Sequence, residues 1–156
     1  MSIGMGIRVG PKAVHFTVVK SLPDDQFELL LIDKINIPGA MDEPYKLSYL
    51  RTNLLSIIMR FNVTNAGIRI TEGTAQTVST FRIYLEGVIQ ELFADSPVEK
   101  YSLSKKTTIA RYLGKTIDNI TDYFEGRNDF VGIPDIPKSH LEKRESILTA
   151  LAALEL

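Results

Sequence analysis

The chain has 156 residues, of which 44% are hydrophobic and 24% are charged, and this is enough apolar material for one sizeable core. Its 18 basic and 19 acidic residues give a formal net charge of -1, so a nucleic-acid partner would have to bind a local basic patch. The absence of cysteine excludes disulfides and thiolate chemistry, and two histidines argue against a structural zinc site.

The sequence has no apolar run of about 18 residues, and from its N-terminal composition we expect no secretory leader. We therefore expect one soluble domain over residues 1–156, a cytoplasmic location and no membrane partner.

Strands dominate the first part of the chain. The stretch GIRVGPKAVHFTVV contains an opening strand, a turn and the start of the next strand. FELLLIDKINI, residues 27–37, follows a Pro-Asp-Asp turn, and its early apolar run predicts a strand buried on both faces. Because short turns join these three strands, we expect them to be antiparallel neighbours.

Helices and short strands alternate in the rest of the chain. Apolar spacing predicts helices over 44–61 and from Val78 to Leu92, and the strands 66–70 and 98–103 follow one helix each. Two strands separated by a helix fit a right-handed parallel crossover. The sequence thus predicts an α/β fold with a mixed sheet.

Capping residues mark the last helices. Ser104 is a candidate N-cap for a helix that ends at Gly114, and Thr116 opens another helix to about Phe124. A long loop over 125–138 precedes a terminal helix, which Ser139 and Glu142 begin as a capping box. Its predicted buried stripe consists of Leu141, Ile147, Leu148, Leu151 and Leu154.

This order of elements resembles the RNase H-like fold, and within it the RuvC-type Holliday junction resolvases. The segments that carry the resemblance are GIRVGPKAVHFTVV, GIRITEGTAQ, SLSKKTTIARYLGK and EKRESILTALAAL. The resemblance implies a five-stranded mixed sheet, three strands antiparallel and then two parallel, flanked by helices. It also implies hydrolysis of phosphodiesters by Mg²⁺ or Mn²⁺ ions held between carboxylates.

The chain departs from the family at its first acidic position, where Arg8 stands in place of an aspartate. Glu72 and Glu145 match the later acids, and Glu142 is a further candidate. An arginine cannot coordinate a metal, so we predict a degenerate site in which Arg8 pairs with Glu72, with Glu145 as a second partner. If the site is active, these three glutamates are the metal ligands, and Asp129 or Asp135 supplies the missing one.

Each of these residues also has an ordinary structural interpretation. Arg8 could face solvent or hold a loop, and Glu72 could favour the N-terminus of the helix that follows it. Glu142 is better placed as a cap than as a ligand, whereas Glu145 falls at the rim of the helical stripe and can lean toward the sheet. Arg144 falls near the middle of that stripe, where only a cleft or a carboxylate partner would suit it.

Basic residues could contact phosphate at one end of the sheet. Lys105 and Lys106 lie in the first turn of a predicted helix, where backbone amides favour anions, and Arg111 and Lys115 follow. The other members of the set are Arg8, Lys12 and Arg144. The alternative is a solvated helical face.

Three functions remain open from the sequence. The first, which we favour, is a RuvC-like domain that has lost metal-dependent cleavage and binds structured nucleic acid or a protein partner without a cofactor. The second is an active magnesium-dependent nuclease with a rearranged acidic site, and the third is a scaffold or enzyme that shares only the fold. The resemblance also implies a homodimer, for which the apolar face of helix 44–61 is a candidate surface.

Overall fold

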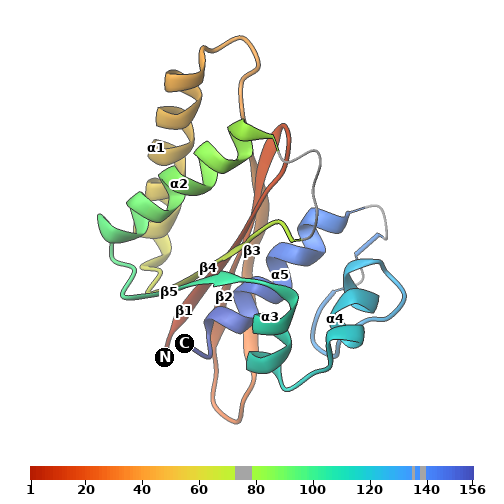
Figure 1. Ribbon diagram of the computed structural model, residues 1–156. Coiled ribbons are helices and arrows are strands. Elements are labelled where there is room, and N and C mark those ends of the chain that lie inside the picture. The colour runs from red at the N-terminus through yellow and green to blue at the C-terminus, as the bar shows by residue number, and fades with distance from the viewer. Residues whose placement is uncertain (73–78, 135, 138–139) are drawn as a thin grey trace.

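The computed structural model describes residues 1–72, 79–134, 136–137 and 140–156 of the chain (Figure 1). Its sheet has five strands in the order β3-β2-β1-β4-β5. The strands are β1 (Ile3–Val9), β2 (Ala13–Ser21), β3 (Phe27–Asn36), β4 (Asn65–Arg69) and β5 (Lys100–Ser104). β1, β2 and β3 are antiparallel, whereas β4 runs parallel to β1 and to β5. The predicted mixed α/β sheet is confirmed.

Helices cover both faces of the sheet (Figure 1). α1 (Glu43–Phe61) and α2 (Thr80–Ala94) lie on one face, and α3 (Lys106–Leu113), α4 (Ile117–Phe124) and α5 (Leu141–Ala153) lie on the other. Each layer of helices encloses its own apolar core against the sheet. Among the described helices, none combines the length and the hydrophobicity that crossing a bilayer requires.

The two faces of β1 carry different kinds of side chain. Met5, Ile7 and Val9 are fully buried in the core beneath α1 and α2. On the opposite face, a Cβ atom added to Gly6 would lie 2.2 Å from the Ser146 carbonyl oxygen and 2.2 Å from the Ala150 nitrogen. The backbone of α5 therefore lies directly against β1. Because side chains alternate along a strand, Arg8 emerges on this same face, toward the start of α5.

The structure confirms several local predictions and corrects others. Thr116 and Asn119 form a complete capping box at the start of α4, and Gly114 ends α3 with a φ of 63°. Ser104, however, belongs to β5 and lies beside Arg69 in the parallel ladder, so Lys105 is the N-cap of α3. The strand pairing overrides the capping preference at that position.

Two predicted burial patterns are wrong. Among the described strands, β3 lies at the edge of the sheet and pairs with β2 alone, and its residues are mostly half-buried or exposed rather than buried on both faces. Leu141 is 42% exposed, whereas α5 is buried around its whole circumference from Arg144 onward because β1, β2, β4, α3 and α4 surround it. The predicted helix start at Val78 and the capping serine Ser139 lie outside the described residues.

Candidate functional site

Two arginines lie side by side at the carboxyl ends of β1 and β4. Arg8 and Arg69 are partners in the parallel ladder, so their side chains leave the sheet on the same face. Arg8 also donates a hydrogen bond of 2.9 Å from Nη1 to the carbonyl oxygen of Arg69. The strand pairing thus places two guanidinium groups beneath the first turns of α5.

Glu145 of α5 lies between these two guanidinium groups. Its Oε1 is 3.2 Å from Nε of Arg8, and its Oε2 is 2.9 Å from Nε of Arg69. The carboxylate side chain is only 4% exposed. Burial raises the pKa of Glu145, and the charge of Arg8, followed by that of Arg69, opposes this rise. Both oxygens of the carboxylate are therefore committed to ion pairs inside the protein.

Glu72 pairs with Arg69 rather than with Arg8. Its Oε2 lies 2.8 Å from Nη1 of Arg69 and also accepts a hydrogen bond of 2.9 Å from the backbone nitrogen of Lys106. Among the described residues, Arg8 forms its ion pair with Glu145 alone. Glu72 therefore acts as an acid at a helix N-terminus, but the helix is α3 and not the one that follows it in sequence.

The sequence interpretation missed Arg69, which contacts both glutamates of the site. Burial lowers its pKa, and the nearby carboxylate of Glu145 opposes that change. Its guanidinium lies 5.4 Å from the ring centre of Phe124 and also donates to the carbonyl oxygen of Ile70. A signal was present in the sequence, because Arg69 interrupts an apolar strand just as Arg8 does.

A third arginine approaches from the opposite layer of helices. Arg82 of α2 donates a hydrogen bond of 2.7 Å from Nη2 to the carbonyl oxygen of Val9. Burial lowers the pKa of Arg82, and the charge of Arg8 lowers it further. Burial also raises the pKa of half-buried Glu86, and the charges of Arg8 and then Arg82 oppose this rise. This end of the sheet is thus a network of alternating charges.

The described residues do not fit a divalent cation. No group of three or more histidine, aspartate or glutamate side chains among them is arranged to hold a metal ion. Both oxygens of Glu145 face guanidinium groups, which would repel an ion at the same place. Glu142 lies beside Gly10, and Asp129 pairs with Arg144 at 3.1 Å, so neither completes a cage. Asp135 lies outside the described residues.

Arg144 is a buried structural residue and does not belong to an exposed basic surface. It is 1% exposed and donates to the carbonyl oxygens of Tyr123, Asn128 and Ile136 at 2.6, 3.0 and 2.6 Å. Its guanidinium also lies 4.3 Å from the ring centre of Tyr123. Because these contacts use its donors to hold α4 and the following loop, we remove Arg144 from the predicted phosphate-binding set.

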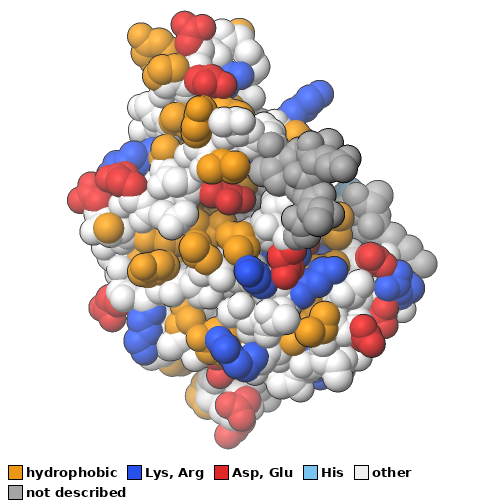
Figure 2. Space-filling view, viewed as in Figure 1, with side chains coloured by type: hydrophobic (Ala, Val, Ile, Leu, Met, Phe, Trp, Pro, Cys, Tyr) orange, Lys and Arg blue, Asp and Glu red, His pale blue; other side chains and the backbone are white. Residues whose placement is uncertain are grey.

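The remaining basic residues of that set are accessible. Lys12 is exposed in the turn after β1, Lys105, Arg111 and Lys115 are exposed in and around α3, and Lys106 is half-buried. The carboxylate of Glu72 already occupies the backbone amide of Lys106, so it would compete with a phosphate there. On the face seen in Figure 2, basic side chains are interspersed with acidic ones and do not form one continuous patch.

No protein-family model matches the chain, and no curated protein matches its sequence significantly. Solved structures match its fold. Thermus thermophilus RuvC has a TM-score of 0.73 at 14% identity, over 98% of this chain and 93% of that one. The T. thermophilus RuvC complex with a Holliday junction substrate gives a TM-score of 0.72 at 15% identity, with the same coverage. The yeast mitochondrial Holliday junction resolvase has a TM-score of 0.60 at 17% identity, and the match covers 97% of this chain and 77% of the resolvase.

Proposed function

We propose that this chain, which has the fold of the RuvC-type Holliday junction resolvases, binds branched nucleic acid and has lost metal-dependent cleavage. The observation that carries the proposal is the pair of contacts from Glu145 to Arg8 and Arg69. Two guanidinium groups occupy the positions beside the last-helix acid where a nuclease of this fold would need cations. The electrostatic role of the metal is thereby replaced by fixed protein charges.

Nucleic acid is the partner that the fold and the surface favour together. A structural neighbour is known in complex with a Holliday junction substrate, and we carry that class of ligand over to this chain. Lys12 and Lys105 follow the carboxyl ends of β1 and β5, which lie at the same edge of the sheet as Arg8 and Arg69. Exposed lysines at that edge can contact phosphates without an intervening ion.

An active nuclease would require a different arrangement of the same residues. Arg8 and Arg69 would have to leave Glu145, and Glu72 would have to release both Arg69 and the α3 amide. Removing partners from buried charges is costly, so the ion pairs stabilise the inactive arrangement.

Binding and cleavage can be measured in one set of assays. The protein is mixed with a four-way junction and with a linear duplex of the same base composition, at several salt concentrations, with and without Mg²⁺. We expect salt-sensitive binding that favours the junction and no cleavage in either condition. Cleavage that requires Mg²⁺ would contradict the loss of activity, and equal failure to bind both nucleic acids would contradict the proposed partner.

Metal binding provides an independent measurement. We expect no saturable Mn²⁺ binding to the wild-type chain by water-proton relaxation, because the guanidinium groups fill the site. Glu145→Gln, verified as folded by circular dichroism, is the control, since binding seen in the wild type and lost in the folded variant would place an ion on Glu145 and reject the proposal.

We also propose that the chain forms a homodimer through α1 and α2. Exposed apolar side chains gather on these helices (Figure 2), namely Tyr45, Met59, Ile83 and Tyr84. A groove of about 510 Å³ between the two helices adds a concave surface. Sedimentation equilibrium gives the oligomeric state directly.

A further inference from the structure

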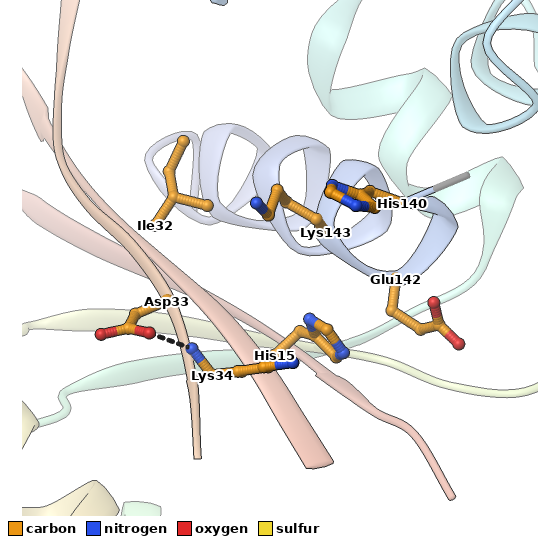
Figure 3. Close-up of a pocket in the computed structure, with 7 residues that line it drawn as sticks. All are labelled: His15, Ile32, Asp33, Lys34, His140, Glu142 and Lys143. Atoms are coloured by element: carbon orange, nitrogen blue, oxygen red, sulfur yellow. Dashed lines mark hydrogen bonds between the residues drawn. The ribbon is translucent and has the colours of Figure 1, made fainter. Parts of the chain in front are cut away.

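A small pocket lies beside the arginine site, between β2, β3 and the start of α5 (Figure 3). Its volume is about 200 Å³. The residues that line it are His15, Ile32, Asp33, Lys34, His140, Glu142 and Lys143. Only Glu142 among them belongs to the site described above, and the proposed function assigns no role to the others.

The sheet and α5 bring the basic members together. His15 pairs with Lys34 in the β2–β3 ladder and with Arg8 in the β1–β2 ladder, so all three side chains leave the same face of the sheet. His140 and Lys143 reach over this face from the start of α5 (Figure 3). The pocket therefore adjoins the arginine site across a single strand spacing.

With neutral histidines, the two lysines and the two carboxylates of the pocket have no net charge, and protonation of His15 makes the sum positive. Two lysines and two histidines face two carboxylates. Asp33 accepts a hydrogen bond of 2.8 Å from the backbone nitrogen of Lys34, and the Glu142 carboxylate points away from both lysines (Figure 3). The open space between the lysines thus favours an anion.

His15 is the group whose protonation reports on this space. Burial lowers its pKa, Glu142 opposes the change, and the charges of Lys34, Lys143 and His140 lower the pKa further. The empty pocket therefore favours neutral His15 near pH 7. An anion between these groups would favour the charged imidazolium and raise the pKa again.

The start of α5 adds to the same preference. No side chain among the described residues caps this helix, and its first turn contributes backbone amides that are not used within the helix. These amides and the helix dipole favour an anion at the end of the helix where His140 and Lys143 lie.

We propose that this pocket binds one phosphate group of a nucleic-acid strand whose neighbouring part lies over the arginine site. The inference rests on the proposed function, because nucleic acid supplies the phosphate. The volume is below the roughly 300 Å³ at which pockets for small organic molecules begin, so it suits a single tetrahedral anion with a few waters rather than a nucleoside.

Inorganic phosphate tests the pocket without any nucleic acid. The imidazole signals of His15 are followed by NMR during pH titrations with and without phosphate, and chloride at equal ionic strength is the reference. We expect saturable phosphate binding and an upward shift in the pKa of His15. The variant Lys34→Ala/Lys143→Ala should lose both effects, whereas the control Lys20→Ala/Lys46→Ala, which removes the same charge elsewhere, should keep them.

Failure of this measurement is separable from failure of the proposed function. If phosphate does not alter His15, or if the pocket variant responds like the control variant, the pocket proposal is rejected even when the junction binds. If phosphate binds the wild type but the junction does not, the proposed function fails. The pocket would then bind a phosphate-bearing ligand other than nucleic acid, and the proposal that it binds a nucleic-acid phosphate is rejected. Circular dichroism verifies that each variant is folded.

Hairpins with and without a 5′-phosphate identify the source of the phosphate. Lys34→Ala/Lys143→Ala should weaken binding about tenfold and reduce the magnitude of the slope of log affinity against log salt by about 0.9, the value for one phosphate contact. An equal loss for both hairpins indicates an internal phosphodiester, and a loss confined to the phosphorylated hairpin indicates a terminal phosphate. Unchanged affinity for both hairpins rejects the proposal.

Discussion

Glu145 is a single carboxylate that compensates two guanidinium groups, of which that of Arg69 is buried and that of Arg8 is half-buried. Its ion pairs differ in kind from the exposed pair between Arg51 and Glu91, where the glutamate side chain is 59% accessible. Water screens the exposed charges and replaces a lost partner, but it has little access to Arg69, which is 4% exposed. The buried triad of Arg8, Glu145 and Arg69 is therefore sensitive to the loss of any one charge.

Replacing Glu145 by glutamine should be strongly destabilising. Glu145→Gln keeps the shape of the side chain but removes the carboxylate that pairs with Arg8 and leaves Arg69 with Glu72 alone, so the free energy of unfolding should fall by about 3 to 5 kcal/mol. Urea denaturation measures the change. Glu91→Gln is the matched control and should leave stability nearly unchanged, since its arginine is solvated. Equal stability of the two variants would mean that the triad contributes little.

The sequence predicted the charged residues of the site better than their pairing. Arg8 was visible because it interrupts an apolar strand, and Glu145 because it falls at the rim of an apolar helical stripe. The partner of Arg8 depends on which residue of β4 lies beside it, and that register is set by long-range strand pairing. The predicted pair between Arg8 and Glu145 is confirmed, whereas the predicted pair between Arg8 and Glu72 is wrong because Glu72 pairs with Arg69.

At the scale of elements, α5 connects the core to the site. Its contact with the sheet depends on residues without a Cβ, since Gly6 and Gly67 lie beneath Ser146, Thr149 and Ala150. This close approach brings Glu145 within reach of both arginines. The distance between the helix and the sheet is thus a determinant of the ion pairs.

A methyl group on Gly6 should separate α5 from β1. Gly6→Ala places a Cβ atom 2.2 Å from two backbone atoms of α5, so we expect a loss of about 3 kcal/mol or more in urea denaturation. Gly87→Ala, at an exposed position of α2, is the control. It meets nothing within 4 Å and should stabilise the protein by about 0.5 to 1 kcal/mol, because alanine favours a helix. Similar results for both variants would contradict the close packing.

Elements that depend on neighbouring residues were predictable, and those that depend on distant partners were less so. The capping box of Thr116 and Asn119 acts within one helical turn, so the sequence contains all of its determinants. The exposure of β3 depends on its place at the edge of the sheet, and Ser104 joins β5 because Arg69 lies across from it. Neither fact can be read from a window of a few residues.

For the molecule as a whole, near-neutral charge limits the electrostatic contribution to binding. A net charge of -1 provides little general attraction for a polyanion, so the affinity has to come from a few local contacts. The exposed cations in and around the sheet edge and α3 are Lys12, Lys105, Arg111 and Lys115. Four phosphate contacts correspond to a slope of about -3.6 for log affinity against log salt.

Charge-removing variants at the sheet edge test this small number of contacts. Lys12→Gln/Lys105→Gln should reduce the magnitude of the salt slope for junction binding by about two, because two phosphate contacts are lost. Lys46→Gln/Arg60→Gln removes the same charge from α1 on the opposite face and should not change the slope. Fluorescence anisotropy over a range of salt concentrations gives both values, and equal slopes for the two variants would reject the assignment of the contacts.

The position of α5 after every strand in the chain also determines when the protein can complete its fold during synthesis. The sheet can pair and pack against α1 and α2 while later residues are still inside the ribosome. The other face of the sheet is covered only after residues 141–153 have been synthesised. Until then, Gly6 and Gly67 have no helix packed against them, and Arg8 and Arg69 have no carboxylate from Glu145. The core beneath α3, α4 and α5 therefore closes after the core beneath α1 and α2, because it needs a helix that follows all five strands in the sequence.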